Sequence, residues 1–175
     1  MLYWDEQWNF HKSEFESLSD NNAVLVACEC FVHAYQNLSF YLAGKLPPTT
    51  LELINEVISV LNESAAALPK EEAVPEKLLQ KLKVDIGNGS KEVGDGREKI
   101  LESLHHICKS ANGEATKKEA YNGIFSAYSA ILLKESFSQK SQLTSEQLTY
   151  NFEKNSQACR KEIDFQLLKL GEYLR

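Results

Sequence analysis

The sequence predicts an all-α fold, a compact bundle of about seven helices. Apolar residues recur at helical spacing along most of the 175 residues, and no segment shows the convincing alternation of a β-strand. Capping residues, glycines and prolines fall between these amphipathic segments. The length and the ordinary globular composition predict one domain, residues 1–175, that is large enough to bury its own core.

The N-terminal part predicts two helices. The first covers residues 5–18 and carries its large aromatic side chains on one side: Trp4, Trp8 and Phe15. Asp20 or Asn21 is expected to cap the second helix. This helix runs to about residue 42 and ends at Gly44, because two prolines follow.

Two further helices and a glycine-rich segment follow. Thr50 is expected to cap the third helix, whose apolar stripe extends from Leu51 to Ala65. Pro75 suits the first turn of the short fourth helix. The glycine-rich segment, residues 86–96, lacks the Lys-Ser/Thr ending of a P-loop and the ligand pattern of a calcium-binding hand. We expect it to be a surface connection.

The C-terminal part predicts three more helices. Residues 100–111 and 121–132 each carry an apolar stripe. Thr144 is expected to cap the last helix, because Gln147 completes a capping box before the stripe that ends at Leu174. Amphipathic helices of this number bury their stripes most readily by packing into a bundle.

Charge is unevenly distributed along the chain, whose net charge is −6. Residues 1–76 hold twelve acidic and three basic side chains, a balance of −9. Residues 77–175 hold thirteen acidic and sixteen basic side chains, a balance of +3. An acidic N-terminal half repels nucleic acid and attracts basic partners, although a solvated acidic surface that only confers solubility gives the same numbers.

The absence of targeting signals predicts a cytoplasmic protein. Acidic residues stand where a signal peptide has a basic region, and no apolar run approaches the roughly 20 residues of a membrane span. The four cysteines are therefore expected to be reduced thiols that pack as small hydrophobic side chains: Cys28, Cys30, Cys108 and Cys159.

The segment VLVACECFVHAY, residues 24–35, is the first candidate site. Cys28 and Cys30 lie about 200° apart around a helix and cannot chelate one ion. Glu29 and His33 share a face and could supply two metal ligands. No further ligand has suitable spacing nearby, so we expect a central buried helix with Glu29 and His33 on its polar edge.

His105 and His106 form the second candidate. His105 borders the apolar stripe of its helix, and His106 points outward. Neither has a carboxylate or cysteine of the same helix in ligand register, so we expect partly buried, hydrogen-bonded histidines. The Arg–His spacing of HEPN-type ribonucleases is also absent, because Arg97 lies too far before His105. These residues give no positive argument for an enzyme, a metal or a cofactor.

Several segments resemble one bacterial family. ACECFVHAYQNLSFY, residues 27–41, resembles the first long helix of the YjaG-like family, a domain of unknown function, but keeps only Phe40 of the family's Pro-x-Tyr-x-x-Phe element. Similarity continues through residues 52–63 and 100–135, and residues 161–164 stand where the family's pattern resembles Arg-Asp-Ile-Glu. The resemblance implies a divergent, all-helical cytoplasmic protein and carries over no catalytic residue.

We expect a binding protein: an immunity protein that neutralises a cognate antibacterial toxin of the nuclease type. A nuclease is basic where it holds phosphates, so an acidic protein can steer toward that surface and cover it. The expected contacts are acidic residues around an aromatic anchor: Asp5, Glu6, Glu14, Glu16, Glu63, Glu71, Glu72 and Glu76, with Trp4 or Trp8. Core packing is the alternative interpretation of the two tryptophans.

Two other functions remain open. One is a YjaG-like interaction module with a housekeeping or signalling role, which could form a homo-oligomer. The other is a small helical enzyme, which would gather Glu29, His33 and one histidine of the 105–106 pair in a single pocket. Neither nucleic acid nor a membrane is an expected partner.

Overall fold

The computed structural model of the chain describes residues 2–89, 96–138 and 150–175. Within these ranges the protein is all-helical and contains no β-strand, so the predicted fold class is confirmed. The helices are α1 (Tyr3–Ser17), α2 (Asp20–Ala43), α3 (Pro48–Ser64), a short 3₁₀ turn (Ala65–Ala67), α4 (Glu76–Gly89), α5 (Arg97–Ala111), α6 (Thr116–Ser138), α7 (Tyr150–Asn155) and α8 (Gln157–Tyr173). The described residues thus form eight α-helices rather than about seven.

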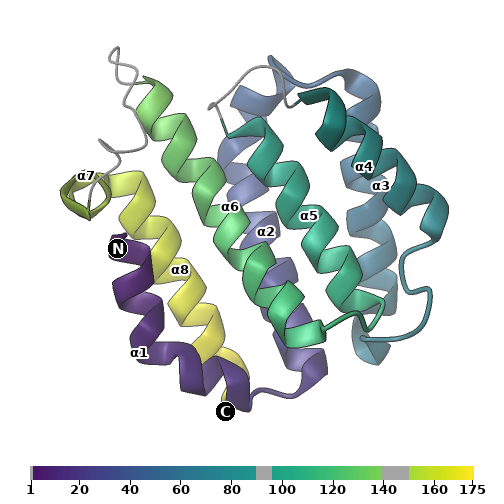
Figure 1. The fold of residues 1–175 in the computed structure, drawn as a ribbon, viewed down its shortest axis with the longest axis horizontal. Coiled ribbons are helices and arrows are strands. Elements are labelled where there is room, and N and C mark those ends of the chain that lie inside the picture. Colours follow the sequence, from purple (N-terminus) through teal and green to yellow (C-terminus); the bar gives the residue numbers. More distant parts are fainter. Residues whose placement is uncertain (1, 90–95, 139–149) are drawn as a thin grey trace.

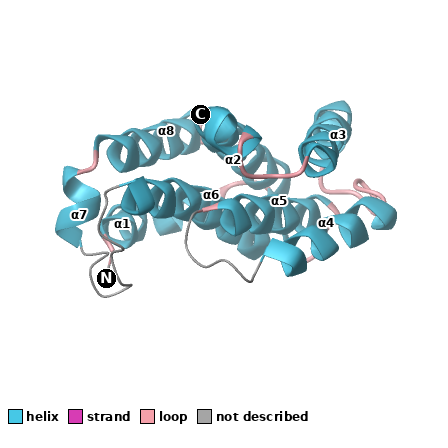
Figure 2. Cartoon of the chain, turned by 90° about the horizontal axis from the view of Figure 1, so that it is seen from above, coloured by secondary structure: helices cyan, strands magenta, loops and turns pink. Residues whose placement is uncertain are grey.

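The helices pack in two layers (Figures 1 and 2). In Figure 2, α8, α2 and α3 lie along one side of the molecule, and α1, α6, α5 and α4 lie along the other. α2 contacts α8 and α3 in its own layer and α5 and α6 in the other, and the contacts of α8 with α6 and α1 and of α3 with α4 also connect the two layers. No helix in the described ranges is both long enough and apolar enough to cross a membrane.

α2 is central because its sequence is apolar nearly all round, as predicted. Its start differs from the prediction: Ser19 is the N-cap, and its hydroxyl accepts a 3.1 Å hydrogen bond from the backbone nitrogen of Asn22. Asn21 instead donates from Nδ2 to the carbonyl oxygens of Ala65 and Leu68. This residue therefore ties the start of α2 to the end of α3 rather than capping a helix.

The start of α3 also differs from the prediction. Pro47 occupies the N-cap position and Pro48 the first turn, so Thr50 lies inside the helix and does not cap it. Thr50 is buried, and its hydroxyl donates a 2.8 Å hydrogen bond to Asp85 of α4. α4 begins directly after Pro75 and continues through Gly89, so part of the glycine-rich segment is helical; residues 90–95 of that segment lie outside the described residues.

The predicted last helix is two helices. Ser156 separates α7 from α8 and caps α8, because its hydroxyl accepts a hydrogen bond from the backbone nitrogen of Cys159. The apolar stripe continues across this break, which explains why periodicity alone did not reveal it. The predicted cap at Thr144 and its partner Gln147 lie outside the described residues.

Candidate functional site

A groove runs along the polar edge of α2, between α3 and α8. Figure 2 shows α3 and α8 on the same side of the molecule, one on each side of α2. The groove has a volume of about 510 Å³, and its lining residues are Cys28, Glu29, Val32, His33 and Gln36 of α2, Ile58 and Asn62 of α3, and Phe165 and Lys169 of α8. The 3.6-residue repeat of α2 places its five lining residues on one edge. The predicted pair Glu29 and His33 therefore lies together in this groove.

His33 is held between α2 and α8 by two contacts. Its ring stacks on Phe165, with the ring centroids 3.7 Å apart and the planes 5° from parallel. Its Nδ1 lies 2.8 Å from Oε2 of Glu162, whose side chain is 1% exposed, whereas that of His33 is 27% exposed. A carboxylate accepts hydrogen bonds, so Nδ1 donates to Glu162, and Nδ2 of Asn37 lies 3.3 Å from Nδ1 and 3.4 Å from Nε2 of the same ring.

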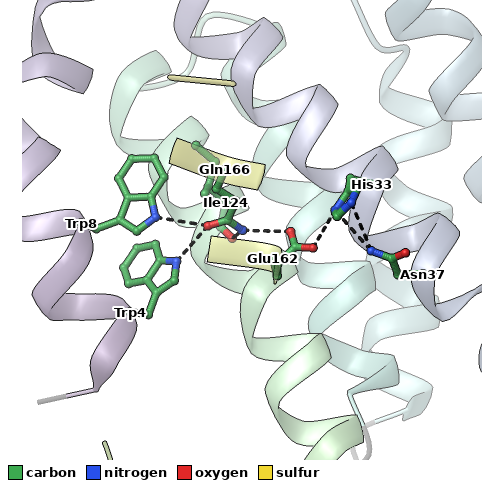
Figure 3. A network of polar contacts seen from close by, with 7 residues as sticks. All are labelled: Trp4, Trp8, His33, Asn37, Ile124, Glu162 and Gln166. Carbon is green, nitrogen blue, oxygen red and sulfur yellow. Dashed lines mark hydrogen bonds and ion pairs between the residues drawn. The ribbon is translucent and has the colours of Figure 1, made fainter. Parts of the chain in front are cut away.

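Glu162 connects His33 to the core through Gln166 (Figure 3). Gln166 is fully buried and donates from Nε2 to Glu162 over 3.1 Å and to the Ile124 carbonyl oxygen over 3.3 Å. Its Oε1 accepts from the indole nitrogens of Trp4 at 2.9 Å and Trp8 at 3.2 Å. A continuous polar chain therefore crosses the bundle from α1 to the groove, and each of its buried members has partners.

Lys169 neutralises part of the negative charge in the groove. Its ammonium lies 2.9 Å from Glu29 and 2.8 Å from Glu172. Burial pushes the pKa of Glu29 up, but hydrogen bonds from Lys169 and Tyr173 and the charge of Lys169 outweigh burial and lower this pKa below its ordinary value. Glu29 is therefore a carboxylate at neutral pH and accepts hydrogen bonds from both α8 side chains.

The two cysteines of α2 lie where burial disfavours the thiolate form. Burial, with a smaller contribution from Glu29, raises the pKa of Cys28 to about 12, and burial raises that of Cys30 well above its usual value. All four cysteines are free thiols, three of them buried and Cys28 half-buried, which agrees with their predicted packing as small hydrophobic side chains. Among the residues that the structure describes, no three histidine, cysteine, aspartate or glutamate side chains are grouped closely enough to hold a metal ion.

The predicted aromatic anchor of a partner surface is wrong. Trp4 is 2% exposed and Trp8 is not exposed at all. Both rings pack against Tyr121, and both indoles donate to Gln166, so they belong to the core between α1, α6 and α8. Because an indole has one polar atom on a large apolar ring, a buried acceptor such as Gln166 is enough to hold it inside.

The eight predicted acidic contacts form two groups rather than one surface. Figure 1 shows α1 at one end of the bundle and α3 and α4 at the other. Asp5, Glu6, Glu14 and Glu16 lie on α1; Asp5 accepts from the backbone nitrogen of Leu2, and Glu14 pairs with His11. The remaining four lie at the end of α3 and just before or at the start of α4, and all of them are exposed: Glu63, Glu71, Glu72 and Glu76.

The second histidine pair lies outside the groove. His106 is half-buried rather than outward-pointing, and its Nδ1 lies 2.6 Å from Glu119 of α6, which Lys109 also approaches at 3.4 Å. His105 has a buried Nε2 that forms no hydrogen bond with any residue in the described ranges. Neither residue lines the groove that contains Glu29 and His33. The structure therefore does not bring Glu29, His33 and a histidine of the 105–106 pair into the single pocket that was expected for a helical enzyme.

Sequence reasoning missed two buried polar residues of α8: Glu162, which contacts His33, and Gln166, which contacts the two tryptophans. Glu162 and Gln166 lie on α8 at positions that share a face with Cys159, Ile163 and Leu170, which are all buried. Two polar residues inside an apolar stripe are the signal that could have identified them. Their partners are up to 162 residues away in the chain, so the pairing itself needed the fold.

Comparisons with known proteins identify no relative. No protein-family model, curated protein or solved structure matches this chain. The resemblance to the YjaG-like family therefore stays a prediction.

Proposed function

We propose that the protein is an acidic cytoplasmic binding module, an immunity protein that covers a basic, nuclease-type toxin. The observation that supports this proposal is the uncompensated charge on α3 and on the connection to α4. Residues 46–76 contain one basic residue, Lys70, and six exposed carboxylates: Glu52, Glu56, Glu63, Glu71, Glu72 and Glu76. None of these six forms an ion pair with any described residue.

Unpaired exposed carboxylates are available to a partner. Paired charges on one molecule attract little from outside, whereas a single-sign surface creates a field that accelerates association with a surface of opposite sign. A nuclease carries such a surface because it must hold phosphates. An all-helical protein that presents its carboxylates there can occupy the substrate groove without performing chemistry of its own.

The test partner is the nuclease-type toxic domain that the proposal expects to be encoded beside this gene; a locus without such a domain would already contradict the proposal. Isothermal titration calorimetry should show tight binding, and the nuclease activity of that domain should fall to background at one equivalent of this protein. The association rate should decrease steeply with added salt, because exposed charges are screened. Retained nuclease activity at saturating protein would contradict the proposal.

A matched pair of variants separates local from diffuse charge. Glu52→Lys/Glu56→Lys changes the charge on α3, and Glu14→Lys/Glu16→Lys makes the same change on exposed positions of α1. We expect the α3 variant to slow association with the toxic domain by about tenfold or more, whereas the α1 variant should change it little. Equal effects of the two variants would show that only the overall charge matters.

A further inference from the structure

We propose that the groove between α3 and α8 binds an amphipathic helix of the partner, apolar on one side and rich in lysine or arginine on its flanks. This inference rests on the proposed function and names the form of the partner segment. The groove follows the α2 edge from Cys28 to Gln36, and the same edge continues to Phe40, which is four residues after Gln36 and seven after His33. That edge spans about 18 Å, the length of roughly three turns of helix.

The edge ends at an aromatic residue that nothing covers. Phe40 is 96% exposed, more than any other large hydrophobic side chain in the described ranges. Val32, Ile58 and Phe165 supply apolar surface inside the groove, and Leu168, three residues after Phe165 on α8, is 58% exposed. A single exposed phenylalanine is common, but one in line with an apolar groove fits the anchor position of a binding surface. Phe40 is therefore our candidate for the aromatic anchor of the binding surface, because Trp4 and Trp8 are buried in the core.

The charges around the groove favour a basic binding partner. Among the described residues that line the groove, Lys169 is the one lysine or arginine, and it is already paired with two carboxylates, Glu29 and Glu172. On α3, the groove is lined by Ile58 and Asn62, and Glu52, Glu56 and Glu63 recur at intervals of four and seven on the adjacent solvent-facing side, where all three are exposed. Cationic flanks of the occupant that extend over α3 would therefore meet carboxylates that form no ion pair with the described residues.

The walls of the groove are held in place before binding. His33 is fixed by stacking on Phe165 and by Glu162, while Glu29 is fixed by Lys169 and Tyr173. Side chains that are already ordered lose little entropy when a partner docks. The described helices offer no open strand edge, so a helix laid in the groove, rather than an added strand, is the fitting mode of recognition.

The test selects binders from a phage-displayed library of helical peptides of about 20 residues, randomised on one face. We expect the enriched peptides to be amphipathic and basic, and to bind the purified protein with an affinity measurable by fluorescence anisotropy. Phe40→Ala should weaken this binding by about tenfold or more, and Glu52→Lys/Glu56→Lys should weaken it as well. The matched controls, Phe10→Ala at an exposed phenylalanine of α1 and Glu14→Lys/Glu16→Lys, should leave it unchanged.

Three results would overturn the inference: no enrichment over an unrelated helical protein, enrichment of neutral or acidic peptides, or binding that survives Phe40→Ala. Sedimentation of the protein alone adds a fourth, because a dimer that Phe40→Ala dissociates would assign the groove to a second copy of the chain. Circular dichroism of every variant checks that the fold is intact. If Phe40→Ala leaves inhibition of the toxic domain unchanged, the groove is not the binding site, but the proposed function is still supported. If the protein binds the peptides but does not inhibit the toxic domain, the groove is still supported as a binding site, but the proposed function is contradicted.

Discussion

The two ends of the bundle are built from different side chains. The chain contains no phenylalanine, tyrosine or tryptophan between residues 44 and 120, which include α3, α4 and α5. These helices bury mainly aliphatic residues, among them Leu53, Ile54, Leu82 and Leu104. The other end, α1 with α6, α7 and α8, buries an aromatic cluster together with large polar residues that include Glu153, Glu162 and Gln166.

The two ends therefore stabilise the fold in different ways: the aliphatic end by non-directional burial, and the aromatic end by specific polar contacts. Aliphatic burial is non-directional and tolerates repacking, whereas a buried polar chain is stable only when every member has its partner. At the aromatic end, Glu153 accepts from the backbone nitrogen of Tyr3 over 2.7 Å and from the hydroxyl of Tyr128, so it ties α7 to α1 and α6. The groove lies where the two ends meet, with α3 from one end, α8 from the other and α2 beneath both.

The largest expected effect comes from removing a buried indole. Trp8→Ala should lower the free energy of unfolding by about 3–5 kcal/mol, because it leaves a cavity in the aromatic cluster. Urea denaturation followed by circular dichroism measures this loss. Phe10→Ala, two residues further along α1 at a side chain that is 74% exposed, should stay within about 0.5 kcal/mol of the wild type. Equal losses at the two positions would disprove the placement of α1 on the core.

A second pair of substitutions compares the ends directly at nearly constant side-chain volume. Gln166→Leu leaves two indole N–H groups without an acceptor and removes one of the two donors to Glu162, the other being His33, and should lower the free energy of unfolding by about 2–3 kcal/mol. Leu82→Met in the aliphatic end should change it by less than about 1.5 kcal/mol. The midpoints of denaturant unfolding give both changes in the free energy of unfolding, provided that the denaturant dependence (the m value) is the same for each variant. A milder effect for Gln166→Leu would show that the polar chain is not a structural requirement.

The same contrast explains what the sequence could predict. Aliphatic stripes such as Leu101, Leu104 and Cys108 repeat at helical spacing, so the helices and the all-α class followed from periodicity. The predicted start of a helix was wrong where several neighbouring residues can serve as the N-cap. Ser19, Asp20 and Asn21 are all suitable, and Asn21 is not the cap because its side chain donates to distant carbonyl groups.

The site was only half predictable for the same reason. Glu29 and His33 were identified from their shared face, but a polar residue gives no sign of burial until its partner helix is known. Glu162 and Gln166 are buried because Trp4, Trp8 and His33 arrive from helices distant in sequence. The tryptophans look like interface anchors in the sequence because the buried acceptor that holds them lies about 160 residues away.

A smaller effect is expected at His105, at the aliphatic end. Burial, together with the charges of Lys83, His106 and Lys109, lowers the pKa of His105, and Glu119 opposes this only in part. The unfolded chain therefore binds the proton more readily, so this stability is present above the usual histidine pKa and is lost as the pH falls from that value to the lower pKa of the folded protein. His105→Leu removes this step and the unpartnered Nε2, and should raise the free energy of unfolding by up to about 1 kcal/mol. Denaturation at pH 7.5 and pH 5.5 measures both effects, and an unchanged pH dependence would contradict the assignment.

The smallest expected effect concerns Glu29, which joins α2 to the aromatic end at the groove. Because the pKa of Glu29 is lowered in the folded protein, its stabilisation is present above the pKa of an unfolded glutamate and is lost as the pH falls through the folded value. Glu29→Gln should therefore show a shallower loss of stability than the wild type below about pH 4.5, with little difference at neutral pH, since an exposed pair contributes little. Glu63→Gln, at an exposed carboxylate without an ion pair among the described residues, is the matched control and should follow the wild-type curve. If both variants flatten the curve equally, the acid sensitivity comes from general charge and not from the contacts that Lys169 and Tyr173 make across the groove.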